Sequence, residues 1–219
     1  KDKGTGVKVR IKTPENITLV TAEQYANAAI TAGVTDAEIE VAAVSKVTGE
    51  SALTGVYKAF EANGVQLDAK RTEVAQQELE VTNKIAQENA NQKGFDSSKL
   101  DKAMIEIKKE LAELKQKQGQ LATKEDIERI INDALKNNSL QNVISKDQIN
   151  ALVAFAQNYQ NTSAIDSKQV LEQLNSLSKS VGEKINSLVE QAKNEGWLDK
   201  IAQFFSSIFE SIKNLFNQQ

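Results

Sequence analysis

The sequence predicts a mostly helical α+β fold, in which a small α/β domain of two or three strands and two helices precedes an all-α helical bundle. Two observations support this prediction. Apolar and charged residues alternate in two short segments near the N-terminus, and apolar residues then recur at intervals of three and four along the chain. Because 219 residues are enough for two hydrophobic cores, we place the domains at residues 1–90 and 95–219.

Two segments of the first domain have the alternation of a strand with one buried face, namely residues 7–12 and residues 38–41. A helical segment separates them, and a strand–helix–strand succession of this spacing predicts two parallel strands joined by a crossover. Residues 17–20 form a further short extended piece. Because two or three strands rarely stand alone, we expect residues that precede Lys1 in the parent protein to complete the sheet.

The two helices of this domain have recognisable ends. Thr21 and Gln24 have the spacing of a capping box, in which each side chain accepts the backbone N–H of the other residue. Gly33 should end the first helix, because glycine readily adopts a positive φ after the last turn. Thr48 should cap the second helix, which we expect over residues 50–61.

From Asp68 onward the pattern is helical. A polar helix runs to Asn89, and residues 89–94 form a polar stretch ending in glycine, which we interpret as the domain boundary. The next helix has large apolar residues at alternating intervals of four and three, a coiled-coil-like pattern, and a helical bundle would bury such stripes. The caps predicted for the bundle helices are Ser97 or Ser98, Thr123, Ser145 and Ser167.

The C-terminal segment, residues 197–216, has an amphipathic pattern with a wide apolar stripe. We expect it to fold back and close the bundle. Self-association, docking into a partner's groove and binding to a membrane surface are the alternatives, and the small number of basic residues in the segment weakens the last of them. The aromatic residues of this partner or membrane face are Trp197, Phe204, Phe205, Phe209 and Phe216.

The chain contains neither cysteine nor histidine. Zinc, copper and iron–sulfur sites normally need thiolate or imidazole ligands, and thiol nucleophiles and Ser–His–Asp triads need the same side chains, so these sites and mechanisms are excluded. The 27 basic and 30 acidic residues give a formal charge of −3, whereas nucleic-acid binding usually requires a basic surface. We therefore expect no metal, no cofactor and no nucleic-acid partner.

Two stretches carry a family resemblance: GVKVRIKTPENITLVTAEQYANAAITAG at residues 6–33 and DAEIEVAAVSKVTGESALTGVYKAFE at residues 36–61. They resemble the DUF1002 family of uncharacterised proteins from Gram-positive bacteria, and the resemblance extends through QQELEVTNKI to about residue 85. It implies an exported protein with a signal peptide and a longer N-terminal part, which fits a chain that begins with Lys1 rather than Met. The resemblance implies no known activity and no catalytic residues.

Thr48, Gly49 and Ser51 form the most enzyme-like stretch. The sequence Gly-Glu-Ser-Ala at residues 49–52 resembles the start of a nucleophile elbow, but Leu53 stands where that motif has glycine, and the chain has no histidine to act as the base. The interpretation that we favour is a capped helix start. Because a helix N-terminus with several hydroxyls can also hold an anion, these three residues are a candidate anion site.

Charged side chains line the two predicted strands. Lys8, Arg10 and Lys12 share one face, which could meet teichoic acid or an anionic lipid, although we favour a solvated strand face. Glu38 and Glu40 also share a face and could contribute to a calcium site, because calcium takes oxygen ligands. The chain lacks the spacing of an EF-hand, so we favour a solvated edge here too.

The sequence therefore predicts a secreted or cell-surface protein that acts as a non-catalytic interaction or structural module, with a protein partner or a second copy as its ligand. One alternative is a protein that binds the membrane surface or the cell envelope through residues 197–216. The other is a hydrolase centred on Thr48 and Ser51.

Overall fold

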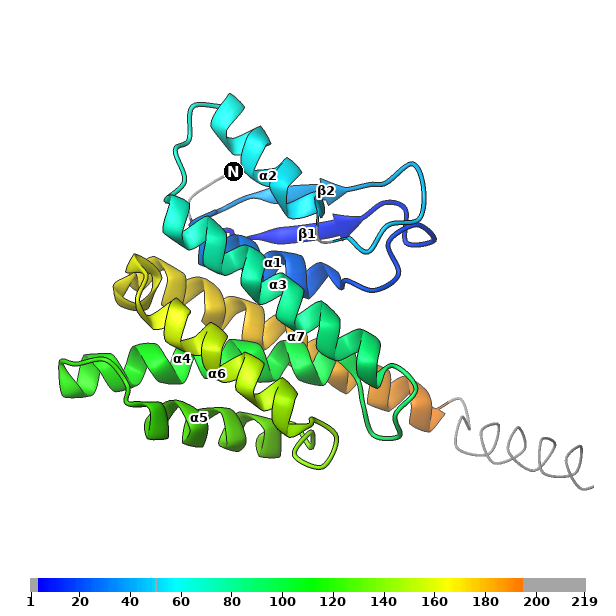
Figure 1. Ribbon diagram of the computed structural model, residues 1–219. Coiled ribbons are helices and arrows are strands. Elements are labelled where there is room, and N and C mark those ends of the chain that lie inside the picture. The colour runs from blue at the N-terminus through cyan, green and yellow to red at the C-terminus, as the bar shows by residue number, and fades with distance from the viewer. Residues whose placement is uncertain (1–3, 50, 195–219) are drawn as a thin grey trace, which may run out of the picture. The chain divides into compact units, whose positions relative to one another are not determined.

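The computed structural model describes residues 4–49 and 51–194 (Figure 1). The chain separates into two compact units after Val181, and the first unit is the subject of the following paragraphs. The boundary predicted at residues 89–94 falls within this first unit. The predicted amphipathic segment at residues 197–216 lies outside the described residues, and so do Trp197 and the four phenylalanines assigned to its apolar face.

A small parallel sheet stands near the N-terminus of the described chain. Strand β1 (Lys8–Ile11) pairs with strand β2 (Glu38–Val41), so both predicted strands and their parallel orientation are confirmed. The short piece at residues 17–20 contributes one isolated bridge, between Ile17 and Val47. On each strand a partly buried apolar side chain alternates with an exposed charged one, which is the pattern that the sequence predicted.

Helix α1 (Ala22–Ala32) connects the two strands and lies at the centre of the unit. The Thr21–Gln24 capping box is present, and Gly33 ends the helix with a φ of 102°. Every side chain from Gln24 to Ala32 is buried, because the helix contacts β1 on one side and α3 and α4 on others. Figure 1 shows α1 and α2 on opposite sides of the sheet, with α4, α5 and α6 beyond α1. Its many alanines allow this close packing from several directions.

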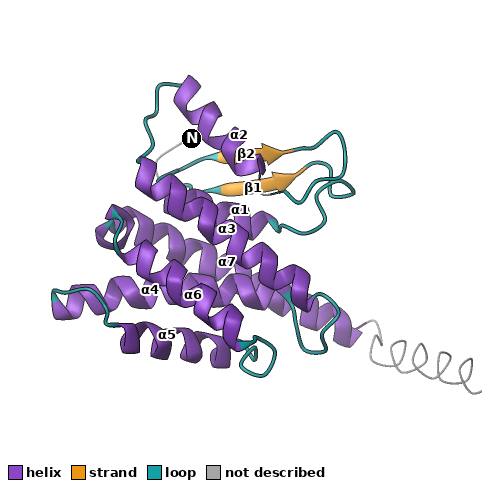
Figure 2. Ribbon diagram, in the orientation of Figure 1, coloured by secondary structure: helices purple, strands orange, loops and turns teal. Residues whose placement is uncertain are grey.

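The rest of the described chain is helical (Figure 2), which confirms the mostly α fold class. The chain forms α2 (Ser51–Ala62), α3 (Ala69–Asn89), α4 (Ser97–Gln118), α5 (Lys124–Asn137), α6 (Lys146–Gln160), a 3₁₀ turn η1 (Ser163–Asp166) and α7 (Lys168–Asn194).

Most helix starts follow the predicted caps. Thr123 and Ser145 form capping boxes at the starts of α5 and α6, and the Ser167 hydroxyl accepts a backbone N–H from the first turn of α7. The cap of α4, however, is Asp96 rather than the predicted Ser97 or Ser98. Its carboxylate accepts the N–H of Ser98 at 2.7 Å, and a charged acceptor suits the positive end of the helix dipole.

The core of this unit has an α/β part and a helical part. In the first part, side chains of the sheet, α1, α2 and α3 pack together around Tyr25, Leu53 and Leu79. In the second, the predicted stripe of α4 is buried, including Leu100 and Met104, and α4 contacts α5 and α6. Each large apolar side chain buried in this way contributes about 1.5–3 kcal/mol. Among the described helices, none combines the length and the apolar character needed to cross a bilayer.

Candidate functional site

The candidate anion site lies at the surface, where the chain enters α2. The helix begins at Ser51, so Thr48 lies three residues before its first residue and the prediction that Thr48 is its N-cap is wrong. The side chains of Thr48 and Ser51 are exposed, whereas Gly49 is buried between them. The N–H of Ala52 donates to the carbonyl of Gly49 at 3.1 Å, which makes a tight turn into the helix. Binding of an anion at this turn stays a prediction.

Gly49 has a packing role of its own. Its φ is 98°, in the left-handed region that favours glycine. The buried Tyr25 hydroxyl donates to the Gly49 carbonyl at 2.5 Å. A Cβ atom at position 49 would lie 2.7 Å from Tyr25 Oη and 3.0 Å from a methyl carbon of Val20, which is too close for any other residue without movement. The turn into α2 is therefore anchored to α1 through Gly49.

Four charged residues of the two predicted strand segments form ion pairs with one another. Arg10 lies 3.0 Å from Glu38 and Lys12 lies 3.2 Å from Glu40, in both cases between side-chain nitrogen and carboxylate oxygen. Each pair is diagonal, because the basic residue lies two positions beyond the residue opposite its acidic partner. The predicted basic face and the predicted acidic face therefore belong to one solvent-exposed surface of the sheet, on which their charges are paired. Among the described residues, no cluster of three or more acidic side chains is arranged to hold a metal ion.

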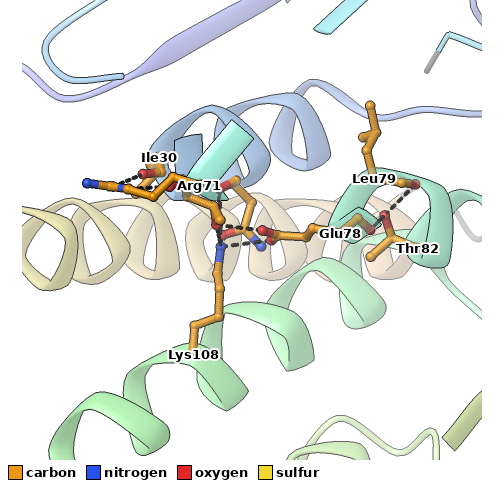
Figure 3. Close-up of polar contacts among 8 residues, drawn as sticks. Ile30, Arg71, Glu78, Leu79, Thr82 and Lys108 are labelled. Atoms are coloured by element: carbon orange, nitrogen blue, oxygen red, sulfur yellow. Dashed lines mark hydrogen bonds and ion pairs between the residues drawn. The ribbon is translucent and has the colours of Figure 1, made fainter. Parts of the chain in front are cut away.

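A polar cluster that the sequence did not predict lies inside the protein, where α1, α3 and α4 meet (Figure 3). Its centre is Lys108 of α4, whose Nζ lies 2.7 Å from Oε1 of Glu78 of α3. The Lys108 side chain is 0% exposed and that of Glu78 is 2% exposed. A buried pair of opposite charges is stable only when further hydrogen bonds satisfy both groups.

Helix α1 supplies these further hydrogen bonds. Lys108 Nζ donates to the Asn27 carbonyl at 3.1 Å and to Thr31 Oγ1 at 2.9 Å. The Thr31 hydroxyl in turn lies 2.6 Å from the second carboxylate oxygen of Glu78, to which it donates. The three acceptors around Nζ match the three N–H donors of an ammonium group. The cluster is therefore closed, with each of its charged groups satisfied by a neighbouring helix.

Two further residues extend the cluster. Arg71 of α3 donates from Nε to the Thr31 carbonyl at 2.7 Å and from Nη2 to the Ile30 carbonyl at 3.0 Å, so it satisfies carbonyls at the end of α1 (Figure 3). Tyr159 of α6 places its ring 5.7 Å from Lys108 Nζ, within range of a cation–π contact. The cluster thus joins four helices.

The acid–base properties of this cluster follow from its burial. Desolvation lowers the pKa of Lys108, and the neighbouring Glu78 carboxylate opposes that effect. Desolvation also raises the pKa of the Tyr159 phenol well above its usual value, with a smaller contribution from Glu78. Perturbed groups of this kind often mark catalytic sites, but here they are sealed from solvent. Their chemistry is therefore structural: they fix the mutual positions of α1, α3, α4 and α6.

The sequence contains a weak signal for this cluster. Glu78 lies four residues after Val74 and seven before Ile85, on the apolar seam of its helix, and Lys108 lies four residues after Met104 on the flank of the α4 stripe. A charged residue at such a position is more often solvated than buried. Only the packing of α3 against α4 in the structure identifies the pair.

Two grooves open along the free edges of the sheet. The β1 groove, of about 300 Å³, lies between β1, the start of α1 and α7. The β2 groove, of about 400 Å³, lies between β2 and α2. Asp36 holds the segment that leads into β1, because its Oδ1 accepts the N–H of Gly6 at 2.9 Å and of Gly4 at 3.0 Å. These hydrogen bonds lower the pKa of Asp36.

Comparison with known proteins identifies relatives of unknown function. A family model described as "Protein of unknown function (DUF1002)" matches residues 1–177. The uncharacterised protein YpuA of Bacillus subtilis (strain 168) is 34% identical over 218 residues, which cover 98% of this chain and 67% of the relative. Both matches extend well beyond the residues 6–85 over which the sequence resembled the family. No solved structure matches the chain.

Proposed function

Because the chain belongs to the DUF1002 family, whose function is unknown, we propose that it is a non-catalytic protein that binds an extended polypeptide at or outside the cell surface. The observation that carries this proposal is the two-stranded sheet, which has a groove along each free edge within the described part of the chain. A free strand edge presents unpaired backbone donors and acceptors. An extended polypeptide pairs with such an edge by strand addition.

The chemistry of the chain supports a binding role over a catalytic one. Two titratable groups with perturbed pKa values, those of Lys108 and Tyr159, are buried in the helical interior. Desolvation also raises the pKa of the half-buried Tyr57 phenol, which donates to the Thr72 carbonyl at 3.4 Å. Thr48 and Ser51 are exposed, but the chain has no histidine to activate a hydroxyl. A hydrolase centred on these two residues would need a base of another kind.

The proposed location rests on composition and on the family resemblance. A chain without cysteine gains no unwanted disulfides in an oxidising environment, and the resemblance to DUF1002 proteins implies export. Fractionation of a bacterium that produces the full-length protein would test this part of the proposal. We expect the protein in the medium or in the cell-wall fraction, and its retention in the cytosol would contradict export.

Selection of peptide ligands would test the binding function. The purified chain is used to select from a phage library of short random peptides, and the selected peptides are synthesised and measured by fluorescence anisotropy. We expect peptides that bind and that mass spectrometry finds intact after incubation with the protein. Cleavage of the peptides would contradict the non-catalytic role, and failure to select any peptide would contradict polypeptide binding.

Membrane-surface binding is a second candidate, because residues 197–216 have the apolar stripe of an amphipathic pattern with several aromatic residues in it. Co-sedimentation with liposomes of phosphatidylglycerol and phosphatidylcholine would test it, with a chain truncated after Gly196 as the control. Binding that disappears on truncation would favour this second candidate. Equal sedimentation of the two chains would exclude a membrane role for the segment.

A further inference from the structure

We propose that the β1 groove binds the extended segment as a third strand, held by the backbone of β1 on one side and by the side-chain amide of Gln173 on the other. This inference rests on the polypeptide-binding function proposed above and assigns its site. The ligand is a segment of a separate partner protein in an extended conformation.

The backbone of β1 provides one wall of the groove. The N–H groups of Lys8 and Lys12 donate to carbonyls of the β2 segment, each at 2.8 Å. Because peptide groups alternate in direction along a strand, the N–H and carbonyl of Val9 point away from β2, toward the groove that Val9 lines. β1 has four residues and offers about 13 Å of edge, at about 3.3 Å per residue. A short extended segment could pair along it.

Gln173 of α7 provides the second observation. Its side chain is 7% exposed, and it lines the β1 groove. Neither its amide oxygen nor its amide nitrogen has a hydrogen-bond partner among the described residues. Buried polar groups are normally paired, because an unpaired one loses its hydration without compensation. An unpaired amide at a groove therefore indicates a missing ligand that can both donate and accept.

The other lining residues leave room for a strand. Gln173, Ser176 and Ser180 recur at intervals of three and four, so they share one face of α7. Alanines from the start of α1 line the groove as well. At the narrow end, a Cβ atom placed on Gly6 would lie 4.0 Å from Ser176 Oγ. On the α7 side the space is thus bordered mainly by uncharged polar groups, whereas Lys8, Arg10 and Glu23 contribute charges of both signs on the opposite side.

A peptide fits this combination of groups better than a charged ligand. The residues that α7 contributes are uncharged, and the charged lining residues Lys8, Arg10 and Glu23 include both signs, so the groove does not favour one sign of ligand charge. The Arg10 side chain is also paired with Glu38. A primary amide presents a donor and an acceptor side by side and is complementary to a backbone peptide group. The groove therefore recognises the backbone of its ligand on both sides, while the ligand's own side chains set the specificity.

The substitution Gln173→Leu tests the site, because leucine keeps the volume and removes both polar atoms. Anisotropy with a selected peptide should show affinity weakened about tenfold or more, as expected for the loss of two hydrogen bonds. Gln169→Leu is the matched control, because Gln169 is exposed on the same helix and does not line the β1 groove. In the free protein, Gln173→Leu should leave the urea midpoint unchanged or raise it.

The peptide itself provides a second test that needs no protein variant. A strand pairs through the N–H groups of alternate residues only. N-methylation of alternate residues on one edge of the peptide should abolish binding, whereas N-methylation of the intervening residues should be tolerated. Equal sensitivity at every position would contradict strand addition.

These experiments distinguish an error in the proposed binding site from an error in the proposed polypeptide-binding function. If selected peptides bind and Gln173→Leu has no more effect than Gln169→Leu, the site is wrong although the polypeptide-binding function stands. If no peptide is selected, both fail. If Gln173→Leu greatly lowers the urea midpoint, the amide has a structural partner and the site is wrong. If the protein is a dimer in sedimentation and Gln173→Leu makes it a monomer, the occupant is a second copy and the proposed partner is overturned.

Discussion

Lys108 Nζ lies 2.7 Å from Glu78 Oε1, and neither side chain is exposed by more than 2%. The two residues are 30 positions apart and belong to α4 and α3, and α1 completes the hydrogen bonds of both through Thr31. The pair therefore links the α/β part of the first unit to its helical part. We therefore expect this link to affect both the stability of the unit and its response to cleavage.

Lys108→Met should destabilise the protein by about 3–5 kcal/mol, because it leaves the Glu78 charge buried without its partner. Urea unfolding followed by circular dichroism would measure this change. The control is Lys84→Met, which breaks an exposed pair with Glu88 and should cost under about 1 kcal/mol. Combining Lys108→Met with Glu78→Leu should cost much less than the sum of the two single changes. Equal effects of the two lysine substitutions would show that the buried pair has no special role.

Tyr159→Phe should leave the protein as stable as before or stabilise it by about 1 kcal/mol at neutral pH. The Tyr159 hydroxyl is buried and has no hydrogen-bond partner among the described residues, so its removal relieves an uncompensated desolvation. Phenylalanine keeps the ring that faces Lys108. Urea unfolding at pH 7 is the measurement, and a loss above about 2 kcal/mol would reveal a hydrogen bond at this hydroxyl.

The same variant should change the alkaline stability. Because burial raises the folded-state pKa of Tyr159, the unfolded chain loses its phenol proton first as the pH rises past about 10. The unfolded state then binds fewer protons than the folded state, so stability falls with pH in this range. The free energy of unfolding of Tyr159→Phe should therefore fall less steeply with pH than that of the wild type, between about pH 9 and about pH 11. Parallel curves for the two proteins would contradict the raised pKa.

Gly49→Ala should destabilise the protein by about 2–4 kcal/mol. The substitution places a side chain at a φ of 98°, which is a strained conformation for alanine, and brings its Cβ within 2.7 Å of Tyr25 Oη. In a Tyr25→Phe background the nearest atom is gone, so Gly49→Ala should cost less there. Gly55→Ala is the control. A Cβ atom at position 55 of α2 would have no other atom within 4 Å, so this substitution should stabilise the protein by up to about 1 kcal/mol. Calorimetric unfolding of Gly49→Ala, Tyr25→Phe, their combination and Gly55→Ala would measure these changes. An equal cost of Gly49→Ala in both backgrounds would contradict the contact with Tyr25.

Local features of this fold could be predicted from the sequence, and non-local ones could not. The capping boxes of Thr21, Thr123 and Ser145 depend on residues three positions apart, so the sequence alone contains them. At α4, the adjacent residues Asp96 and Ser97 are both good caps, and the choice depends on backbone geometry that the sequence does not specify.

The interior cluster and the β1 groove depend on contacts between distant segments. Lys108 meets Asn27 across 81 positions, and no periodic pattern predicts which helix will face it. The β1 groove forms only because α7 lies beside β1, so the sequence alone does not distinguish Gln173 from the other polar residues of α7. The strands themselves were predictable, because apolar and charged residues alternate along a strand that has one buried face. The groove beside them is formed only by tertiary packing.

Limited trypsin digestion should cut the chain at Lys93, because the turn from Ala90 to Gly94 is exposed and connects α3 to α4. Because the Lys108–Glu78 pair and the hydrogen bond from Thr21 to Asp101 cross this turn, the two pieces should stay together. Size-exclusion chromatography should then show one species, which separates only in urea. A folded piece from about Phe95 onward that elutes alone would instead support two independent domains. The variant Lys93→Gln serves as the uncut reference. If the wild type resists cleavage as this variant does, the turn is protected.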